Sequence, residues 1–349
     1  MPPSSHKQPP EIPIRTRLLE IAQRAALFLS PDNQPYVACP LATPLYSESF
    51  FAWFIAETEQ RLGSVPSGHQ VAYVVRTLNA QANASKIFAT PHRRIAKLPH
   101  GKYQLDLGTT DHQVINITGK DWSLSDQCDA YFERLNDNQD LPTPERTKLM
   151  LAECLQPIFK ITRENAVKLA LWLAQALLPG QPPPILIITG TAREAAIEKL
   201  RNLIDPVTCP IIETPYSRRE LPRMALENKV LAFVFDEALT EKMILGFKAF
   251  HAGTRVRLRH HNKAGEKLRT TIHRPILIAS SVPQQISPDQ ITIEINSAES
   301  TLQSKVFGAL LDLLVAIIGI PAQITEPLVL SEPGEMLPTI EETPHPDTS

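Results

Sequence analysis

The chain has 349 residues, enough for two or three domains with a sizeable core. Its 35 Lys and Arg against 37 Asp and Glu give a formal net charge of −2, so any affinity for nucleic acid has to come from a local basic patch. The four cysteines are widely spaced without a C-x-x-C pair, which argues against a zinc site and against a secreted disulfide scaffold. The sequence shows neither a secretory leader nor a run of about 18 apolar residues. We therefore expect a cytoplasmic protein with no membrane partner.

Five regions are expected along the chain. The proline-rich tails at residues 1–13 and 321–349 have too few large apolar groups to offset the entropy of ordering, so we expect them to be disordered. Between the tails we expect a small α+β domain at 14–130, a helical connector at 131–180 and an α/β core at 181–320.

The N-terminal region shows both helical and strand patterns. Helices are expected at 15–29 and 47–62, the second rich in aromatic residues, and strands are expected to follow. Apolar and polar residues alternate at 103–107 and 113–117, and a Gly-Thr-Thr-Asp turn joins these segments. This pattern predicts a pair of half-buried antiparallel strands.

The second half of the chain alternates short apolar runs with helical segments. Thr162 is the expected N-cap of a connector helix that Pro179-Gly180 ends. Strands are expected at 185–188, 210–213, 230–235, 274–279 and 291–295, with a closing helix at 300–318. This alternation indicates a mostly parallel sheet with helices on its faces, and so an α/β fold.

The segment that begins at Ile185 has the frame of a nucleotide-binding P-loop: a buried strand, a turn at Gly190 and a helix. The frame contains no G-x-x-x-x-G-K-[ST]. Where the phosphate cradle would stand, the chain offers only Gly190, Thr191, Arg193 and Lys199. Converging amides, a Lys and a Mg²⁺-binding hydroxyl are the elements that hold nucleotide phosphates. We therefore expect no cofactor, with ATP and Mg²⁺ bound only if this degenerate site still works.

A second element follows at Val230–Phe235, an apolar strand that ends in Asp236 and Glu237. In a Walker B element the Asp helps to hold Mg²⁺ and the Glu orients a water. A strand ending in two acids at a surface turn is an equally common reading of these residues alone. Their position after the P-loop-like strand favours a vestigial Walker B pair.

The most concentrated positive charge lies between residues 255 and 269. Its basic members are Arg255, Arg257, Arg259, His260, His261, Lys263, Lys267 and Arg269. The first three arginines alternate with Val256 and Leu258, and a turn separates them from the return strand. A hairpin with a basic tip suits contact with the phosphate backbone of DNA. The alternative is a solvated charged ribbon.

Other chemistry finds little support in the sequence. There is no G-x-S-x-G, and no Cys and His arrangement indicates a nucleophile. The ten histidines have no Cys or carboxylate at ligand spacing, so no metal site is expected.

The order of the motifs resembles the AAA+ ATP-binding proteins of phages and integrative elements, which are related to superfamily 3 helicases and primase–helicases. The resemblance rests on Leu200-Arg-Asn-Leu-Ile-Asp-Pro206, Arg219-Glu-Leu221, Glu227–Phe233, His251-Ala-Gly-Thr-Arg255 and Arg274-Pro-Ile-Leu-Ile-Ala-Ser280, and it covers roughly residues 20–318. It implies that the basic hairpin contacts DNA and that neighbouring subunits pack side by side.

The departures from this family concern the phosphoryl-transfer site. The Gly-Lys-Ser/Thr loop is shortened, Ser280 or Ser281 replaces the sensor Asn, and no Asp-Arg pair follows Ser287. Because such parts act as a unit, we expect no efficient hydrolysis. The sequence thus predicts a degenerate helicase-like protein of a mobile element that binds DNA or a protein partner, which is either an active AAA+ or primase protein or another copy of this chain. An active ATPase with an unorthodox loop and a nucleotide-independent assembly subunit stay open as alternatives.

Overall fold

The computed structural model describes residues 13–39, 41–134, 137–180, 182–212, 215, 220–259, 267–299 and 303–320, and for 226, 254–259 and 267–272 it describes the backbone alone. The tails expected at 1–13 and 321–349 lie outside the described residues, apart from Pro13. No helix of the described ranges is long and apolar enough to cross a membrane.

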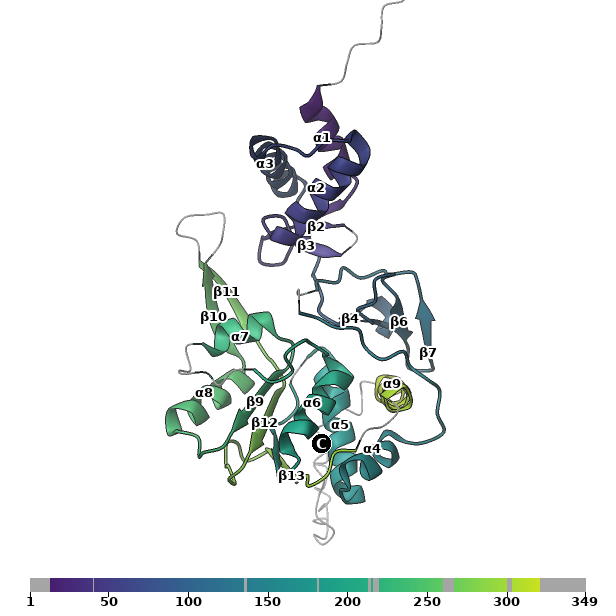
Figure 1. Cartoon of the computed structure of the whole chain (residues 1–349), viewed down its shortest axis with the longest axis vertical. Coiled ribbons are helices and arrows are strands. Elements are labelled where there is room, and N and C mark those ends of the chain that lie inside the picture. Colours follow the sequence, from purple (N-terminus) through teal and green to yellow (C-terminus); the bar gives the residue numbers. More distant parts are fainter. Residues whose placement is uncertain are drawn as a thin grey trace, which may run out of the picture.

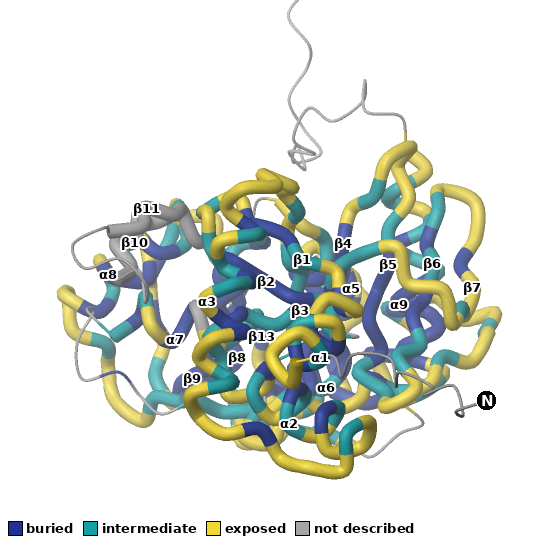
Figure 2. The backbone as a smooth tube through the Cα atoms, turned by 90° about the horizontal axis from the view of Figure 1, so that it is seen from above, coloured by how far each residue is buried: buried dark blue, intermediate teal, exposed yellow. Residues whose placement is uncertain are grey.

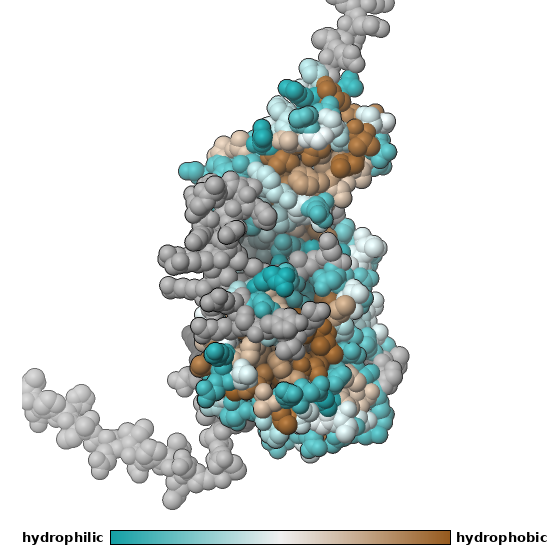
Figure 3. All heavy atoms as spheres, turned by 60° about the vertical axis from the view of Figure 1, so that its left-hand side comes forward, coloured by the Kyte–Doolittle hydropathy of each residue, from teal (hydrophilic) through white to brown (hydrophobic). Residues whose placement is uncertain are grey.

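The N-terminal unit lies at one end of the molecule (Figure 1). It consists of α1 (Ile14–Ala22), β1 (Ala26–Leu29), β2 (Pro35–Ala38), β3 (Ala42–Pro44), α2 (Glu48–Leu62) and α3 (Gly68–Ser85). The Ser47 hydroxyl accepts a hydrogen bond from the Phe50 amide at 3.2 Å and so begins α2 where the sequence predicts. Phe50, Phe54 and Leu78 are fully buried in the core of this unit. Hydrophobic surface also gathers on its outside (Figure 3).

Two expectations for this unit were wrong. The helix expected at 15–29 ends at Ala22, because Ala26–Leu29 pairs with β2 in an antiparallel hairpin. Strands were expected to follow the helix at 47–62, but the next element is the helix α3. It begins with a capping box at Ser67, whose hydroxyl accepts from the Gln70 amide while the Gln70 side chain accepts from the Ser67 amide.

A second sheet follows as an antiparallel meander of β4 (Ile95–Lys97), β5 (Tyr103–Asp106), β6 (Val114–Ile117) and β7 (Trp122–Ser125), with a short 3₁₀ turn, η1 (Pro99–Gly101), between the first two strands. The expected strand pair is confirmed as β5 and β6. Trp122 and Leu105 belong to the same core as Leu310 of the last helix, and the Trp122 Nε1 donates to Asp312 Oδ1 at 2.8 Å. The region expected as one domain, 14–130, therefore contains two units with separate cores.

Three helices join this sheet to the C-terminal half: α4 (Leu151–Phe159), α5 (Arg163–Leu177) and α9 (Gln303–Gly319). Thr162 caps α5 as predicted, since its hydroxyl accepts from the Asn165 amide at 3.3 Å. The closing helix was expected at 300–318, and α9 spans Gln303–Gly319.

The central sheet contains β8 (Leu186–Thr189), β9 (Leu231–Phe235), β12 (Ile276–Ser280) and β13 (Ile291–Glu294) in the order β13-β8-β12-β9, with every pair parallel. The predicted parallel sheet is thus confirmed. The strand expected at 210–213 is not formed in the described residues: Ile212 contributes a single hydrogen bond, from its amide to Ala232 O at 2.8 Å. Glu213 lies outside the described residues.

Helices cover both faces of this sheet. Leu186 and Ile188 face the core formed with α6 (Arg193–Ile204), whereas Ile187 faces α7 (Leu221–Glu227) and α8 (Glu241–His251). This alternation is what a strand buried on both sides requires. In Figure 2 the buried segments lie inside and exposed loops surround them. The chain is therefore of the mixed α/β class.

Candidate functional site

The carboxyl ends of the four parallel strands bring together the residues that the sequence predicts for nucleotide binding. Gly190 follows β8, Asp236 and Glu237 follow β9, and Ser281 follows β12. Ligands of open α/β sheets bind at this edge, where neighbouring connections run in opposite directions. The geometry of these residues therefore decides whether a phosphate could be held there.

The turn after β8 is closed by the segment that follows β13. Gly190 has a φ of +97°, and a Cβ atom at this position would lie 2.5 Å from the Ile295 carbonyl oxygen. The Thr191 amide donates to Asn296 Oδ1 at 3.0 Å, and the Ala192 amide donates to Ile295 O at 3.1 Å. In a P-loop such amides point at phosphate. Here two of them already bind protein oxygens.

Arg193, the first residue of α6, interacts with two other residues of the predicted nucleotide site, Asp236 and Gly190. Its Nη2 lies 2.7 Å from Asp236 Oδ1, and its Nη1 donates to Gly190 O at 3.4 Å. The Arg193 side chain is 19% exposed and that of Asp236 is 75% exposed. Solvent screens a pair of this kind, so it contributes only about 0–1 kcal/mol to stability. It nevertheless gives the carboxylate a cationic partner inside the chain.

The other residues of this edge also bind one another. The Ser281 hydroxyl donates to Asp236 O at 2.6 Å, and Gln284 Nε2 donates to Glu237 O at 3.3 Å. The Glu237 side chain is exposed. Lys199 is not among these residues: it lies farther along α6, beside a small cavity lined by Phe159 and other apolar side chains.

The basic hairpin is present as β10 (Thr254–Arg259) and β11 (Lys267–Ile272), an antiparallel pair whose ribbon extends away from the sheet on the side of the N-terminal unit (Figure 1). The register pairs Arg257 with Arg269, Arg259 with Lys267, and Arg255 with Thr271. Directly paired residues share a face. All five basic residues of the two strands therefore occupy the same face of the ribbon, as predicted for the first strand. His260, His261 and Lys263 lie outside the described residues.

The role of Asn296, which accepts a hydrogen bond from the Thr191 amide in the turn after β8, was not predicted from the sequence. An Asn after the last strand of a sheet carries no distinctive local pattern, and its role depends on the adjacency of β13 and β8. Within the described residues, no three His, Cys, Asp or Glu side chains gather where they could hold a metal ion.

The chain matches no family model, and a search of curated proteins finds no relative. Among solved structures it is similar to the C-terminal region of NrS-1. One apo structure, the A form, has 8% identity and a TM-score of 0.43, covering 86% of this chain and 68% of that one. Another, of residues 305–718, has 10% identity and a TM-score of 0.41, covering 88% and 69%. Because both TM-scores lie below 0.5, we base the function on the chain's own residues.

Proposed function

We propose that this protein binds DNA through the β10–β11 hairpin and does not hydrolyse ATP efficiently. In this proposal it is a degenerate, helicase-like member of the replication machinery of a mobile element, which acts on DNA alone or beside an active partner.

The observation that carries the proposal is the register of the hairpin. Five cationic residues on one face of a two-stranded ribbon form a dense positive strip in a chain whose net charge is −2. Lys and Arg that neutralise backbone phosphates supply the sequence-independent part of DNA affinity. The ribbon extends beyond the sheet, so a strand of DNA can reach it.

The second half of the proposal, the lack of efficient hydrolysis, is supported by the turn after β8. The Thr191 and Ala192 amides bind Asn296 and Ile295, and Arg193 binds Asp236. A nucleotide would have to displace these bonds without gaining the Lys and hydroxyl of a P-loop. Calorimetry with ATP should therefore show no Mg²⁺-dependent binding at micromolar concentration. Micromolar affinity that requires Mg²⁺, or turnover that Glu237→Gln abolishes, would favour the alternative of an active ATPase.

DNA binding is tested with the triple variant Arg257→Ala, Arg259→Ala and Lys263→Ala. Binding is measured by fluorescence anisotropy with single-stranded and duplex oligonucleotides over a series of salt concentrations. The variant should bind more weakly, and its slope of log affinity against log salt should be flatter by about two to three units. Each lost phosphate contact accounts for about 0.7–0.9 of this change.

The matched control removes three positive charges elsewhere in the chain. Lys97, Lys102 and Lys120 are exposed in and around the β4–β7 sheet, away from the hairpin, and their replacement by Ala should leave affinity and slope nearly unchanged. Equal losses in both triple variants would show that only the total charge matters. An unchanged hairpin variant would remove the hairpin from the proposal.

One observation favours the second candidate, a nucleotide-independent assembly subunit. A groove of about 420 Å³ runs between α4, α5 and α9. Leu149, Met150, Val167 and Leu171 line it with side chains that are 42–56% exposed. Light scattering with and without DNA tests this candidate, since a purely monomeric mass in both conditions would contradict assembly of this chain with itself.

A further inference from the structure

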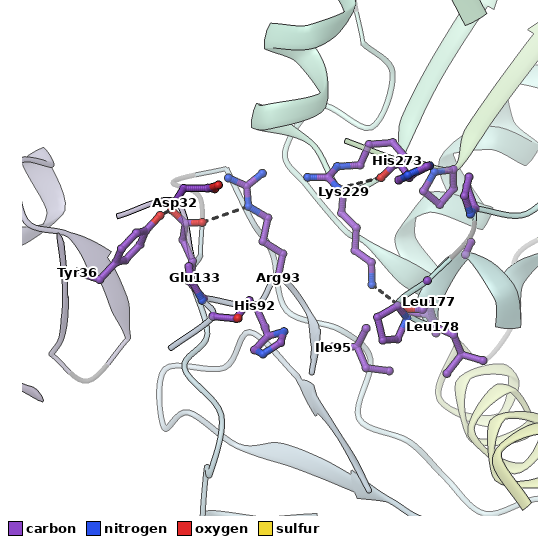
Figure 4. Close-up of a pocket in the computed structure, with 18 of the residues that line it drawn as sticks. Asp32, Tyr36, His92, Arg93, Ile95, Glu133, Leu177, Leu178, Lys229 and His273 are labelled. Atoms are coloured by element: carbon purple, nitrogen blue, oxygen red, sulfur yellow. Dashed lines mark hydrogen bonds and ion pairs between the residues drawn. The ribbon is translucent and has the colours of Figure 1, made fainter. Parts of the chain in front are cut away.

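A cavity of about 530 Å³ lies between the N-terminal unit and the amino-terminal edge of the parallel sheet, the edge opposite to the P-loop-like turn. The cavity receives residues from segments far apart in the chain (Figure 4). Those used below are Asp32, Tyr36, Arg93, Glu133, Lys229 and Arg274. Its volume lies in the range of about 300–1,000 Å³ that small-molecule sites occupy.

The wall on the side of the N-terminal unit contains an ion pair. Tyr36 donates to Glu133 Oε1 at 3.5 Å, and the Arg93 Nε lies 3.4 Å from Glu133 Oε2. Asp32 adds a second carboxylate to this wall, and its burial raises its pKa. The charges of Glu133 and Arg93 offset each other, so this side of the cavity carries a negative charge when Asp32 is ionised.

The wall on the side of the sheet is cationic. Lys229 immediately precedes the apolar run of β9, and its Nζ donates to the Leu177 carbonyl at the end of α5 at 3.1 Å. Lys229 is partly exposed to the cavity and otherwise enclosed by protein. Burial, with a further contribution from the charges of Arg94 and Arg274, lowers the pKa of Lys229 to about 7.

Arg274 forms the second cation of this wall. Its Nε donates to the carbonyls of Ala225 and Asn228 at 2.9 Å, and its Nη1 donates to the His273 carbonyl at 2.9 Å. Burial, with a further contribution from the nearby charge of Arg93, lowers the pKa of Arg274 to about 10. These hydrogen bonds hold the Arg274 guanidinium by neutral carbonyl oxygens, so they do not neutralise its positive charge.

The negative charge near this wall is scarce. Asp205 interacts favourably with both Lys229 and Arg274, but it also lies 3.4 Å from the Arg94 Nε and 3.9 Å from the Arg201 Nη2. One buried carboxylate thus acts on three enclosed arginines and on Lys229 when that side chain is protonated, and only Arg201 among them also interacts with Asp137. Removing charges from water is costly unless opposite charge compensates them. A bound anion beside Lys229 and Arg274 would supply that compensation.

We propose that the cavity binds a phosphate group, which Lys229 and Arg274 hold against the sheet-side wall. Phosphate oxygens accept charge-assisted hydrogen bonds from both kinds of cation. His273 follows the last residue of β11 and also lines the cavity, so the cavity lies at the base of the basic hairpin. Such a phosphate belongs either to a strand of nucleic acid or to a free nucleotide. The first of these sources rests on the proposed function.

Phosphate binding should draw a proton to Lys229. At about pH 8 the free side chain, with its pKa of about 7, is mostly neutral, and an anion beside it stabilises the ammonium. The charged groups that influence Lys229 are Asp205, Arg94 and Arg274, and Asp205 alone favours its charged form. Binding should therefore take up a fraction of a proton for each phosphate bound.

Calorimetry at about pH 8, in two buffers of different ionisation enthalpy, measures both affinity and proton uptake. The probes are inorganic phosphate, thymidine 5′-monophosphate and a thymidine oligonucleotide about 12 nucleotides long. Lys229→Met keeps an unbranched apolar side chain but removes the ammonium, so the variant should fold. We expect it to bind the recognised probe at least about tenfold more weakly and without proton uptake. Lys97→Met, at an exposed position, is the matched control and should change neither quantity.

The pattern across the probes identifies the source. Loss of mononucleotide affinity in Lys229→Met assigns the cavity to free nucleotides, whereas loss confined to the oligonucleotide assigns it to a nucleic-acid strand. The proposal is overturned if the wild-type chain binds none of the three probes or if Lys229→Met binds them as the wild type does. If the hairpin triple variant loses oligonucleotide affinity while Lys229→Met binds all three probes as the wild type does, the proposed function stands and the cavity is excluded. If Lys229→Met loses affinity for a probe while the hairpin triple variant keeps its oligonucleotide affinity, the cavity stands and the proposed function fails.

Discussion

Replacement of Lys229 by Met should make the stability of the protein depend on pH in a different way. The folded chain lowers the pKa of Lys229 from 10.5 to about 7, chiefly through burial. Between these values the unfolded chain keeps a proton that the folded chain has released. Unfolding then takes up a proton, so the free energy of unfolding of the wild type rises with pH in this window. Below about pH 7 both states are charged, and the folded state bears the full cost of the enclosed ammonium.

One proton corresponds to at most about 1.4 kcal/mol for each pH unit. From about pH 7.5 to about pH 9.5 the wild type should therefore gain roughly 1–3 kcal/mol relative to Lys229→Met, the lower part of this range allowing for water in the cavity. Urea unfolding at three pH values, in buffers without phosphate, measures the free energy of each variant. Other groups whose pKa differs between the folded and unfolded chains, such as Cys39, are common to both variants and cancel in the difference. A difference that stays constant from about pH 7.5 to 9.5 would refute the reasoning.

Two further predictions concern stability and are checked by the same unfolding measurements. Gly190→Ala should lower the free energy of unfolding by about 2–4 kcal/mol, because the residue has a positive φ and its added Cβ would meet a backbone carbonyl at 2.5 Å. Gly68→Ala, where an added Cβ has open space, should change it by less than about 1 kcal/mol, and an equal effect at both positions would contradict the closed turn. Asp205→Asn should cost about 2–4 kcal/mol, because it leaves Arg94 and Arg201 without their shared carboxylate. A cost below about 1 kcal/mol would show that backbone carbonyls suffice for these cations.

The parallel sheet could be predicted because its signal is local. Short apolar runs between helical segments identify buried strands, and β8, β9, β12 and β13 lie within a residue or two of the expected segments. The hairpin was also predictable, since basic and apolar residues alternate on both sides of a turn. Thr162 and Ser47 begin their helices as expected, because an N-cap acts only on the next few residues.

The N-terminal unit was harder to predict for a physical reason. Ala26–Leu29 is an apolar segment that either continues α1 or pairs with another strand, and the choice depends on the partner at Pro35–Ala38. Short apolar runs do not distinguish the two outcomes by themselves. The helix α3 was missed although its Ser67 and Gln70 form a capping box that the sequence contains.

The sequence by itself determined the α/β class, the parallel strands, the absence of a P-loop motif and the basic hairpin, because each depends on residues close together in the chain. Only the tertiary structure decided how the side chains of distant segments meet. In the folded chain Arg193 binds Asp236, and Asn296 accepts a hydrogen bond from the Thr191 amide. Lys229 lines a cavity that Asp32 lines from the opposite side. Such pairings arise from the order of strands in the sheet and from the packing of one unit on another. The spacing of residues along the chain does not contain that information.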